Sequence, residues 1–470
     1  MPGAATGADR CGHPALPGER RRCDDRTMTE NPASGTQGTA EAESEVVDIC
    51  RDLIRIDTTN PGDHSGPGER AAAEYVAGLL AEVGVEPMVC ESHPKRTSLM
   101  ARIAGEDPAR PALLIHGHLD VVPANAADWQ LDPFSGEIAD GCVWGRGAVD
   151  MKDMDAMVLA VMRQRLREGR RPKRDVVLAF TADEEAGGKW GASFLAREHA
   201  GMFEGVTEAI GEVGGFSLPV GDQRMYVLQT AEKGLAWMRL TATGTAGHGS
   251  MILEDNAVTA LAEAVARIGR HEWPVRLPES VRAFLTEASA ALGVEFNPED
   301  PWTVIGKLGA MGRMIGATVK HTTNPTGLRA GYKVNVIPQS ATAEIDGRFL
   351  PGYEEEFMAE IDRLLGTEVK REFIHHDIAL ETSADGDLYD AMSASLLAED
   401  PQASVVPYCL SAGTDAKWFS RLGIRCFGFS PLRLPPELDF SGMFHGIDER
   451  VPVSGLRFGV RVLDRFLDMA

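Results

Sequence analysis

The sequence has no apolar run close to the ~20 residues that a membrane-spanning helix needs. Residues 1–26 also lack the apolar stretch of roughly 7–15 residues that marks a secretory signal peptide. The sequence therefore predicts neither a transmembrane anchor nor export by the usual secretory route. We expect a cytoplasmic protein.

Cysteine and positive charge are also scarce. The seven cysteines form no CxxC pair and have no histidine at zinc-finger spacing, so neither a disulfide framework nor a structural zinc finger is predicted. Lys and Arg total 47 against 70 Asp and Glu, which gives a net charge of −23. This charge repels phosphate backbones and anionic lipids and argues against nucleic acid and membrane partners.

What remains is an average globular composition, 43% hydrophobic and 25% charged, in a chain of 470 residues. That length allows two or three domains with sizeable cores. Residues 1–44 are the exception, because Gly, Pro, Ala, Thr and charges leave little apolar surface to bury. We predict a disordered tail there, within which Met28 is an alternative start.

Short apolar runs alternate with helical patterns from Val46 to about Gln229. After two helices, the alternation continues through ALLIHG, a helix over 154–169, DVVLAFTA, a helix around GASFLAREH, and TEAIGEV. Buried strands that alternate with helices are typical of a three-layer α/β domain with a mostly parallel sheet covered on both faces.

The pattern changes at residue 230. Alternating strands such as AWMRLTATGTA, a helix over 256–268 and a strand pair of YKVNVIP with ATAEIDGRFLP predict a smaller, ferredoxin-like α+β unit. After residue 351 the α/β pattern returns. We predict a catalytic domain in two pieces, 45–229 and 351–470, and an inserted lid and dimerisation domain over 230–350.

Histidine and carboxylate side chains follow several of the predicted strands. His118 and Asp120 come after ALLIHG, and they point the same way in an extended chain because Leu119 separates them. A metal-ligating imidazole usually has its second nitrogen held by a carboxylate, so the pair has the form of a ligand and its orienting partner. A loop histidine that binds no ligand is the alternative.

Further carboxylates stand at other strand ends, where open α/β sheets bind ligands. Asp150 follows the glycine-rich GRGAV, and it could instead cap a helix. Asp183, Glu184 and Glu185 follow DVVLAFTA. Adjacent carboxylates near a core repel one another unless a cation neutralises them, whereas a solvated acidic turn would carry them at little cost.

Glu212 in GEVGG and His445 in FHGIDER complete the set. Two histidines with several carboxylates make a site for a first-row divalent ion, and Zn²⁺ is the natural candidate. One zinc ion is too few for five ligands and an additional acid. A pair of ions bridged by one carboxylate fits better, and such pairs serve hydrolysis by acidifying a shared water.

The ordered motifs GHLDVVP, GRGAVDMK, DEEAGG, GEVGGF, GHGS, KVNVIP, GTDA and FHGIDERV resemble those of a zinc metallopeptidase and deacylase family. This family includes aminoacylase, acetylornithine deacetylase, succinyl-diaminopimelate desuccinylase and the glutamate carboxypeptidases. The resemblance runs from about Val46 to the C-terminus. It implies two Zn²⁺ per subunit, with Co²⁺ as a possible surrogate, and a homodimer.

The resemblance also implies how the ions are held. His118 and Glu212 bind one zinc, Glu185 and His445 bind the other, and Asp150 bridges the two. In the Asp-Glu-Gly-Gly version of the family, the glutamate directly precedes the glycine pair. In the segment GEVGG of this chain, Val213 stands between Glu212 and the glycine pair, so the segment is one residue longer there.

Six further residues receive roles from the same resemblance. They are Glu184 as the general base, Asp120 as the partner of His118, His248 as the donor to the developing oxyanion in the site of the neighbouring subunit, Asn335 and Arg348 as binders of the substrate carboxylate, and Gly413 as part of the pocket lining. The alternatives are a loop role for His248 and an ion pair between Arg348 and Asp346.

The implied activity is hydrolysis of an amide or peptide bond next to a free carboxylate in a small-molecule substrate, as in aminoacylases, carboxypeptidases and dipeptidases. One alternative is a biosynthetic deacylase that acts on acylated ornithine or diaminopimelate. A carbamoyl-type amidohydrolase and a non-catalytic binding relative are two others. The complete set of ligands and the base argue against the non-catalytic relative.

Overall fold

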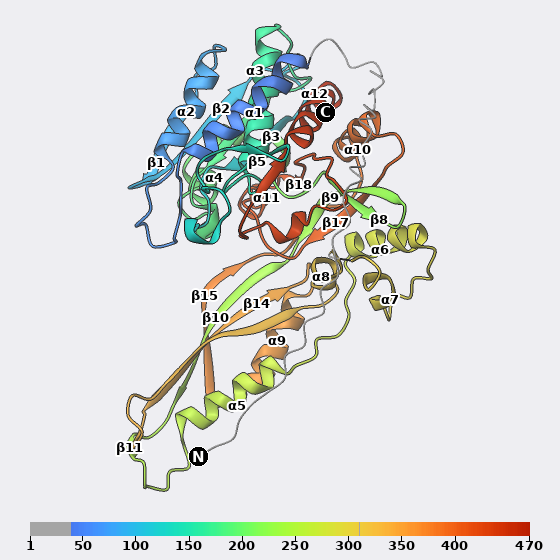
Figure 1. Ribbon diagram of the computed structural model, residues 1–470. Coiled ribbons are helices and arrows are strands. Elements are labelled where there is room, and N and C mark those ends of the chain that lie inside the picture. The colour runs from blue at the N-terminus through green and yellow to red at the C-terminus, as the bar shows by residue number, and fades with distance from the viewer. Residues whose placement is uncertain (1–38, 310) are drawn as a thin grey trace, which may run out of the picture. The chain divides into compact units, whose positions relative to one another are not determined.

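The computed structural model describes residues 39–309 and 311–470 (Figure 1). In these ranges the strands form one large sheet, one four-stranded sheet and two shorter sheets. The predicted tail over 1–44 lies mostly outside the described residues. Its last residues contradict the prediction, because helix α1 (Ala40–Arg55) already begins there and buries Ala42.

The large sheet has a parallel centre. Its parallel neighbours are, in order, β6 (Val176–Thr181), β3 (Ala112–His118), β7 (Val206–Gly211) and β18 (Arg425–Gly428). The flanking strands are β1 (Met88–His93), β2 (Arg96–Ile103), β8 (Phe216–Val220), β9 (Gln223–Glu232) and β16 (Leu380–Glu381), which pair antiparallel, and β17 (Ser404–Leu410), which runs parallel to β9. The predicted α/β class with a mostly parallel sheet is confirmed.

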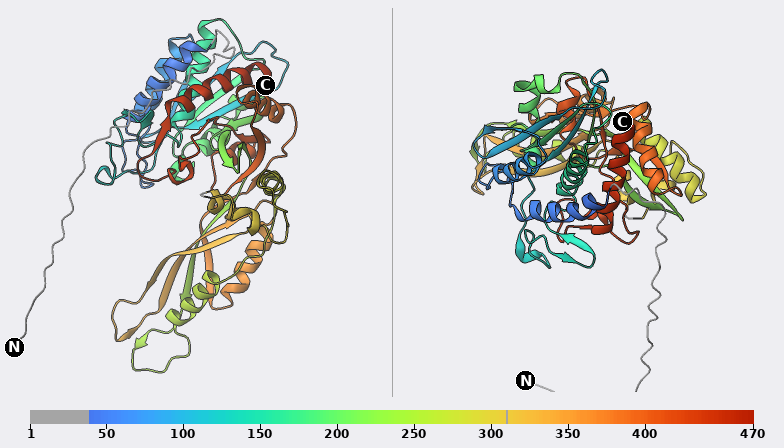
Figure 2. Two further views of the ribbon diagram at one scale, coloured as in Figure 1. Left: turned by 45° about the vertical axis from the view of Figure 1, so that its right-hand side comes forward. Right: turned by 90° about the horizontal axis from the view of Figure 1, so that it is seen from above.

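Side chains of the central strands alternate between two cores, because successive residues of a strand face opposite sides of the sheet. Leu113 and Ile115 of β3 belong to one core and Leu114 belongs to the other. The first core contains α1, α2 (Arg70–Ala81), α3 (Lys152–Arg167) and α12 (Val453–Met469), and the second contains α4 (Ala192–Glu198) and α11 (Ala416–Ser420). The helices therefore cover both faces of the sheet, as Figure 2 shows.

The four-stranded sheet has its own core. Its antiparallel order is β12 (Thr322–Ala330), β14 (Ser340–Phe349), β10 (Gly234–Thr243) and β15 (Val369–Asp377). Helices α5 (Ala257–Gly269) and α9 (Glu354–Leu365) lie against this sheet (Figure 1). Met238 and Phe357 are fully buried between them and the strands. Separate parallel and antiparallel sheets agree with an inserted α+β unit.

The predicted pairing of YKVNVIP with ATAEIDGRFLP is wrong. Residues of the first segment form β13 (Val336–Ile337), which pairs with β11 (Gly247–His248), whereas the second segment forms β14 between β10 and β12. Pro338 directly follows β13 and has no N–H to donate to a hairpin ladder.

Sheet membership differs from the predicted division of the chain in two places. Strand β15 pairs in the four-stranded sheet and helix α9 packs on it. Both follow residue 350, where the predicted insertion ends. In the predicted insertion, α6 (Glu279–Leu292), α7 (Trp302–Ile305) and α8 (Met311–Gly316) bury side chains such as Phe284 and Ile305 in the core of the large sheet. The division into domains itself stays a prediction.

Within the described ranges, no helix is both long enough and apolar enough to cross a membrane. The cysteines of those ranges are unbonded, as the sequence predicts: Cys50, Cys90, Cys142, Cys409 and Cys426. Cys11 and Cys23 lie outside the described residues.

Candidate active site

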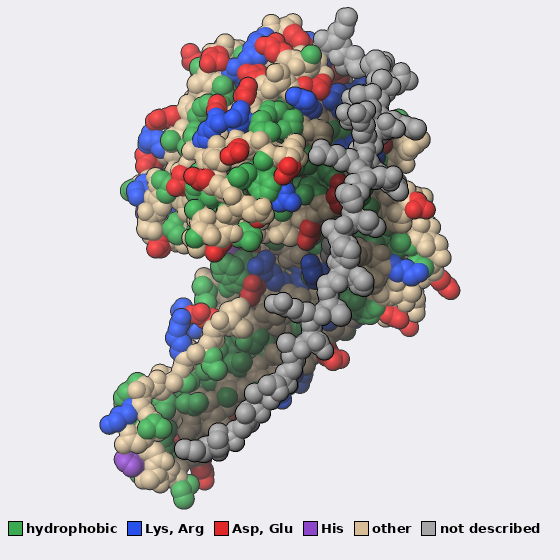
Figure 3. Space-filling model, viewed as in Figure 1, with side chains coloured by type: hydrophobic (Ala, Val, Ile, Leu, Met, Phe, Trp, Pro, Cys, Tyr) green, Lys and Arg blue, Asp and Glu red, His purple; other side chains and the backbone are tan. Residues whose placement is uncertain are grey.

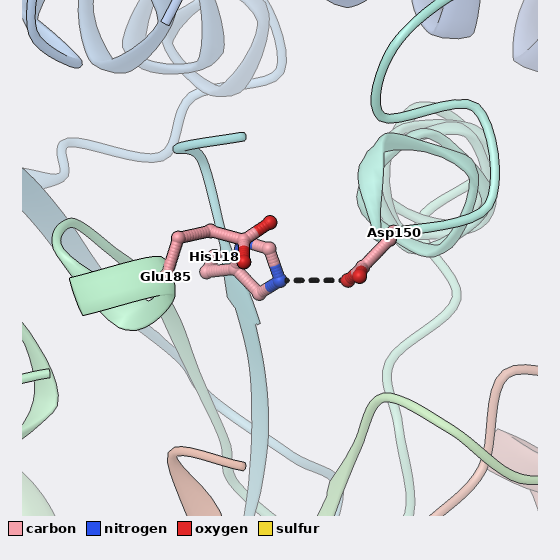
Figure 4. Close-up of side chains that lie close together, drawn as sticks. All are labelled: His118, Asp150 and Glu185. Atoms are coloured by element: carbon pink, nitrogen blue, oxygen red, sulfur yellow. Dashed lines mark hydrogen bonds and ion pairs between the residues drawn. The ribbon is translucent and has the colours of Figure 1, made fainter. Parts of the chain in front are cut away.

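His118 and Asp150 form the centre of the site. His118 ends β3 and Asp150 precedes α3, so both stand at the carboxyl edge of the parallel strands. His118 Nε2 lies 3.1 Å from Asp150 Oδ1 (Figure 4). The alternative role of Asp150 as the N-cap of the helix is wrong, because the N-cap position of α3 is taken by Met151.

Asp150 joins two pairs of side chains. Its Oδ2 lies 3.3 Å from His445 Nε2, which in turn lies 3.0 Å from Glu185 Oε2. On the other side, His118 Nε2 lies 3.6 Å from Glu212 Oε2. One carboxylate therefore stands between a His118–Glu212 pair and a His445–Glu185 pair. A ligand that bridges two metal ions needs this position.

Two sets of ligand atoms in the described chain are compact enough to hold a cation. One set comes from His118, Asp150 and Glu185, the other from His118, Glu184 and Glu212, and the atoms of each set lie within 4.8 Å of one another. The predicted ligands are thus brought together from five separate segments. Glu184 lies as close to this cluster as the ligands do, so proximity alone does not separate a base from a ligand here.

Burial and mutual repulsion make the cluster unfavourable without a cation. Burial and the charge of Glu212 raise the pKa of Glu184 well above its usual value, and burial and Asp150 raise the pKa of Glu185 to about 7. Burial lowers the pKa of His118, but the neighbouring carboxylates of Glu212 and Asp150 raise it well above its usual value. These shifts show how strongly the carboxylates depend on a neighbouring positive charge.

The donor set fits a metal ion in a second respect. Glu185 Oε1 is buried and has no hydrogen-bond partner among the described residues. A buried carboxylate oxygen without a partner is costly, and a divalent cation would satisfy it and offset the repulsion between the acids. The solvated acidic turn is also wrong, because Asp183 and the Glu185 side chain are only 2% and 3% exposed.

Asp120 holds the turn that carries the two glutamates. Its carboxylate accepts hydrogen bonds from the backbone N–H groups of Glu184 and Glu185, each at 3.1 Å. The closest contact from Asp120 to His118 comes instead from the main chain, because His118 Nδ1 lies 2.9 Å from the Asp120 carbonyl oxygen and 3.7 Å from the carboxylate. The structure therefore gives the Asp120 side chain a positioning contact that the sequence does not predict.

A buried carboxylate outside the predicted set, Glu449, holds the loop before Asp150. It accepts hydrogen bonds from the backbone N–H groups of Val149 at 2.7 Å and Gly147 at 3.1 Å, and from Arg146 Nη1 at 2.7 Å. Strand β19 (Arg450–Pro452) pairs with β5 (Cys142–Trp144) and so brings the two segments together. The only signal in the sequence is the place of Glu449 in FHGIDERV, four residues after His445.

Three residues of the site have positive φ angles: Asp183 (68°), Val213 (58°) and His445 (56°). This conformation is uncommon for any residue except glycine, and for the β-branched Val213 it is an outlier. Val213 directly follows Glu212 in the segment that is one residue longer than the Asp-Glu-Gly-Gly version. Backbone strain of this kind gathers at functional sites.

His248 and Asn335 lie together but outside the cluster. His248 pairs with Val336 in the β11–β13 ribbon, and the carbonyl oxygen of Asn335 accepts a hydrogen bond from the Gly249 N–H at 2.9 Å. Both side chains are exposed, and among the described residues neither contacts the acidic cluster. Their predicted roles stay predictions.

The two remaining predicted residues differ in their surroundings. Arg348 forms a two-point ion pair with Asp346, at 2.9 Å and 3.2 Å, which is the contact proposed as its structural alternative. Gly413 lines the same cavity as the acidic cluster. A Cβ atom at Gly413 would lie 2.9 Å from Lys417 Nζ, so a larger residue there would displace the end of this lysine side chain.

Comparison with known proteins identifies the family. Residues 114–469 match the model of peptidase family M20/M25/M40. The chain belongs to this family. It is therefore an amide-bond hydrolase of a metal-dependent peptidase family, and the resemblance seen in the motifs is confirmed.

Relatives of known name agree with this assignment. A probable carboxypeptidase S-like 2 of Dictyostelium discoideum is 30% identical over 77% of this chain and 72% of its own length. Aminoacylase-1 of Sus scrofa is 26% identical over 91% of this chain and 95% of its own length.

Solved structures confirm the fold of the family. The M20 metallo-carboxypeptidase Sso-CP2 from Sulfolobus solfataricus superposes with a TM-score of 0.70 at 18% identity, over 90% of this chain and 99% of that one. The YXEP protein of Bacillus subtilis, described as a dinuclear metal binding peptidase from the M20 family, superposes with a TM-score of 0.60 at 14% identity, over 91% and 97% of the two chains.

Proposed function

We propose that this M20 protein is a co-catalytic dizinc hydrolase that cleaves an amide or peptide bond beside a free carboxylate. The observation that carries the proposal is the position of Asp150 between His118 and His445, with 3.1 Å to one imidazole and 3.3 Å to the other. The relatives named aminoacylase-1 and carboxypeptidase S-like 2 support this substrate class.

Five side chains of this chain would hold the two ions. His118 and Glu212 would bind the first, His445 and Glu185 the second, and Asp150 both, because its two oxygens face the two histidines separately. When bound, two zinc ions polarise a carbonyl group and make water a stronger acid.

Glu184 is our proposal for the residue that moves the proton. It lines the cavity, and its neighbour Glu185 is taken up by the contact to His445. A carboxylate at this place can take a proton from the attacking water and deliver it to the leaving amine. The hydrogen bonds from the Glu184 and Glu185 N–H groups to Asp120 hold the turn from which both side chains project.

A free carboxylate on the substrate needs a cation or a polar donor. The resemblance assigns Arg348 and Asn335 to this task, and we keep both as proposals. Arg313 of α8 is a second candidate, because its side chain is exposed and lines the cavity of the acidic cluster. A guanidinium group binds a planar carboxylate with two parallel hydrogen bonds.

We also propose a homodimer in which His248 serves the active site of the neighbouring subunit. Large apolar side chains near the β11–β13 ribbon are strongly exposed, among them Ile252 at 97% and Tyr332 at 84%. Exposed apolar side chains in a group mark an interaction surface. In Figure 3, apolar side chains lie scattered at this end of the molecule and gather over the adjoining four-stranded sheet.

A substrate panel with metal control tests the proposal. N-acetyl amino acids, dipeptides, N-acetylornithine and N-succinyl-diaminopimelate would be assayed with zinc, after chelation, and after zinc or cobalt is restored. We expect activity to vanish on chelation and to return with either metal. Preference for an ornithine or diaminopimelate substrate would select the biosynthetic deacylase alternative. Full activity in a verified metal-free preparation would exclude the dizinc centre.

A further inference from the structure

The cavity of the acidic cluster also has an apolar wall that the proposed mechanism does not use. Five side chains form this apolar wall: Val213, Phe216, Met314, Leu410 and Phe444. They come from four separate parts of the chain and line one cavity of about 360 Å³ together with Asp150, Glu184 and His445. The apolar wall is therefore continuous with the place where the amide bond would be cleaved.

The apolar wall is held in place by aromatic packing. The Phe216 ring lies 4.9 Å from the Phe440 ring, which lies 5.2 Å from the ring of Phe444. Phe216 itself is only 2% exposed. Such a preformed surface binds an apolar group without first having to order its own side chains.

Met314 reaches the cavity from the segment that the sequence places in the insertion. Met311 and Ile315, on either side of it in α8, are buried in the core of the large sheet. The Tyr408 hydroxyl contacts the Met314 sulfur at 3.5 Å, which ties α8 to strand β17. Met314 is partly buried, as are Val213 and Phe444, but it does not adjoin a predicted metal ligand, whereas Val213 follows Glu212 and Phe444 precedes His445. It can therefore be changed without opening the core or disturbing a ligand.

We infer that the apolar wall is a specificity site that binds a bulky apolar substituent of the amide substrate. The inference rests on the proposed amide hydrolysis and adds a substrate class to it. Binding of an apolar substituent against this wall removes apolar surface from water and so lowers the free energy of the complex. A small or polar substituent would not be stabilised in this way. The substituent is thus an aromatic ring or an aliphatic chain.

The cavity has the size of a small-molecule site. Its volume of about 360 Å³ lies near the lower end of the ~300–1,000 Å³ range of such sites. One aromatic ring or a short aliphatic chain therefore has room beside the acidic cluster.

The apolar substituent can belong to the acyl group or to the amino-acid side chain, and a matrix of substrates separates the two. Acetyl, hexanoyl and phenylacetyl groups would each be joined to glycine, leucine, phenylalanine and glutamate, and kcat/KM would be measured for all pairs. We expect kcat/KM to rise by about 10-fold or more with apolar size along one axis of the matrix. Equal values along both axes, or a preference for glutamate, would overturn the inference.

Met314→Gln tests the apolar wall directly, because it keeps the length of the side chain and makes it polar. We expect the ratio of kcat/KM for the bulkiest preferred substrate to that for N-acetylglycine to fall by about 10-fold. Met358→Gln is the matched control, since Met358 is also partly buried but packs in the four-stranded sheet. An unchanged ratio in Met314→Gln, with the protein folded by circular dichroism, would contradict the proposed role.

A binding measurement decides the inference even if no substrate of the matrix is cleaved. Affinities of the zinc-loaded protein for 4-phenylbutyrate and for acetate would be compared by calorimetry in the wild type and in Met314→Gln. We expect 4-phenylbutyrate to bind at least about 10-fold more tightly than acetate, and the variant to lose most of that difference. Absence of hydrolysis together with this binding pattern would overturn the proposed function alone. Equal affinities would overturn the specificity site.

Discussion

The buried carboxylate of Glu449 accepts a hydrogen bond from the backbone N–H of Val149 at 2.7 Å, one residue before Asp150. The same carboxylate also accepts from Gly147 N–H and from Arg146, so it fixes the whole loop that presents Asp150 to the two histidines. Such supporting contacts around a metal site orient its ligands.

Glu449→Gln should therefore weaken metal binding although Glu449 is not one of the proposed ligands. Both oxygens of Glu449 accept hydrogen bonds. In the Gln variant an NH₂ group, which can only donate, replaces one of these oxygens and faces a backbone N–H or the Arg146 guanidinium. The buried site thereby loses a charge-assisted hydrogen bond. We expect zinc affinity to fall by about 10- to 100-fold and the free energy of unfolding by about 1–3 kcal/mol. Competition with a fluorescent chelator and urea denaturation would measure the two effects.

The matched control is Glu287→Gln on the exposed surface of α6. It makes the same chemical change away from the site, and we expect zinc affinity within error of the wild type. Wild-type zinc affinity in Glu449→Gln would show that the loop before Asp150 does not need this carboxylate.

Glu184→Gln and Glu185→Gln should separate a base from a ligand at adjacent positions. Loss of the proposed base should lower kcat by about 10²-fold or more with both metal ions retained. Loss of the proposed ligand should lower the zinc content, because His445 Nε2 lies 3.0 Å from Glu185 and would keep only Asp150 beside it. Metal analysis by mass spectrometry after dialysis decides the assignment. Zinc loss in Glu184→Gln would make Glu184 a ligand.

Two arginines compete for the substrate carboxylate, and single variants should tell them apart. Arg348→Gln would break the ion pair with Asp346, whereas Arg313→Gln would change only the lining of the cavity. For the residue that binds the carboxylate, we expect KM to rise by about 10-fold or more for an N-acyl amino acid, and to change little for the matching amide, which carries no charge. A KM increase in neither variant would leave the carboxylate without an arginine partner and would argue against both.

The proposed dimer can be tested by subunit complementation. If His248 serves the site of the neighbouring subunit, a mixed dimer of Glu184→Ala and His248→Ala subunits contains one site with both residues intact. Two inactive preparations should then regain activity after subunit exchange. No recovery, with mixed dimers shown by native mass spectrometry, would refute the shared site. A strictly monomeric protein in solution would exclude it altogether.

The sequence by itself determined the fold class and which residues would lie together in the acidic cluster. Apolar runs separated by helical patterns predict β3 and β6, because a strand buried on both faces is apolar along nearly its whole length. The same pattern predicts β7, which is buried over its last three residues. Acidic and histidine side chains placed directly after such strands predict a shared site, because the carboxyl ends of parallel strands meet at one edge of the sheet. His118, Asp150, Glu185, Glu212 and His445 accordingly lie together.

Only the tertiary structure decided which segments support that cluster and shape its cavity. Glu449 contacts Val149 across 300 residues of chain. Met314 reaches the cavity because α6 packs on the large sheet and α7 and α8 follow it into the same core. Periodicity shows that a helix has an apolar face, but it does not show which sheet that face will meet. Contacts between residues far apart in the chain depend on how whole helices and strands pack together. This packing determines the conformation of the loop before Asp150 and which side chains form the apolar wall.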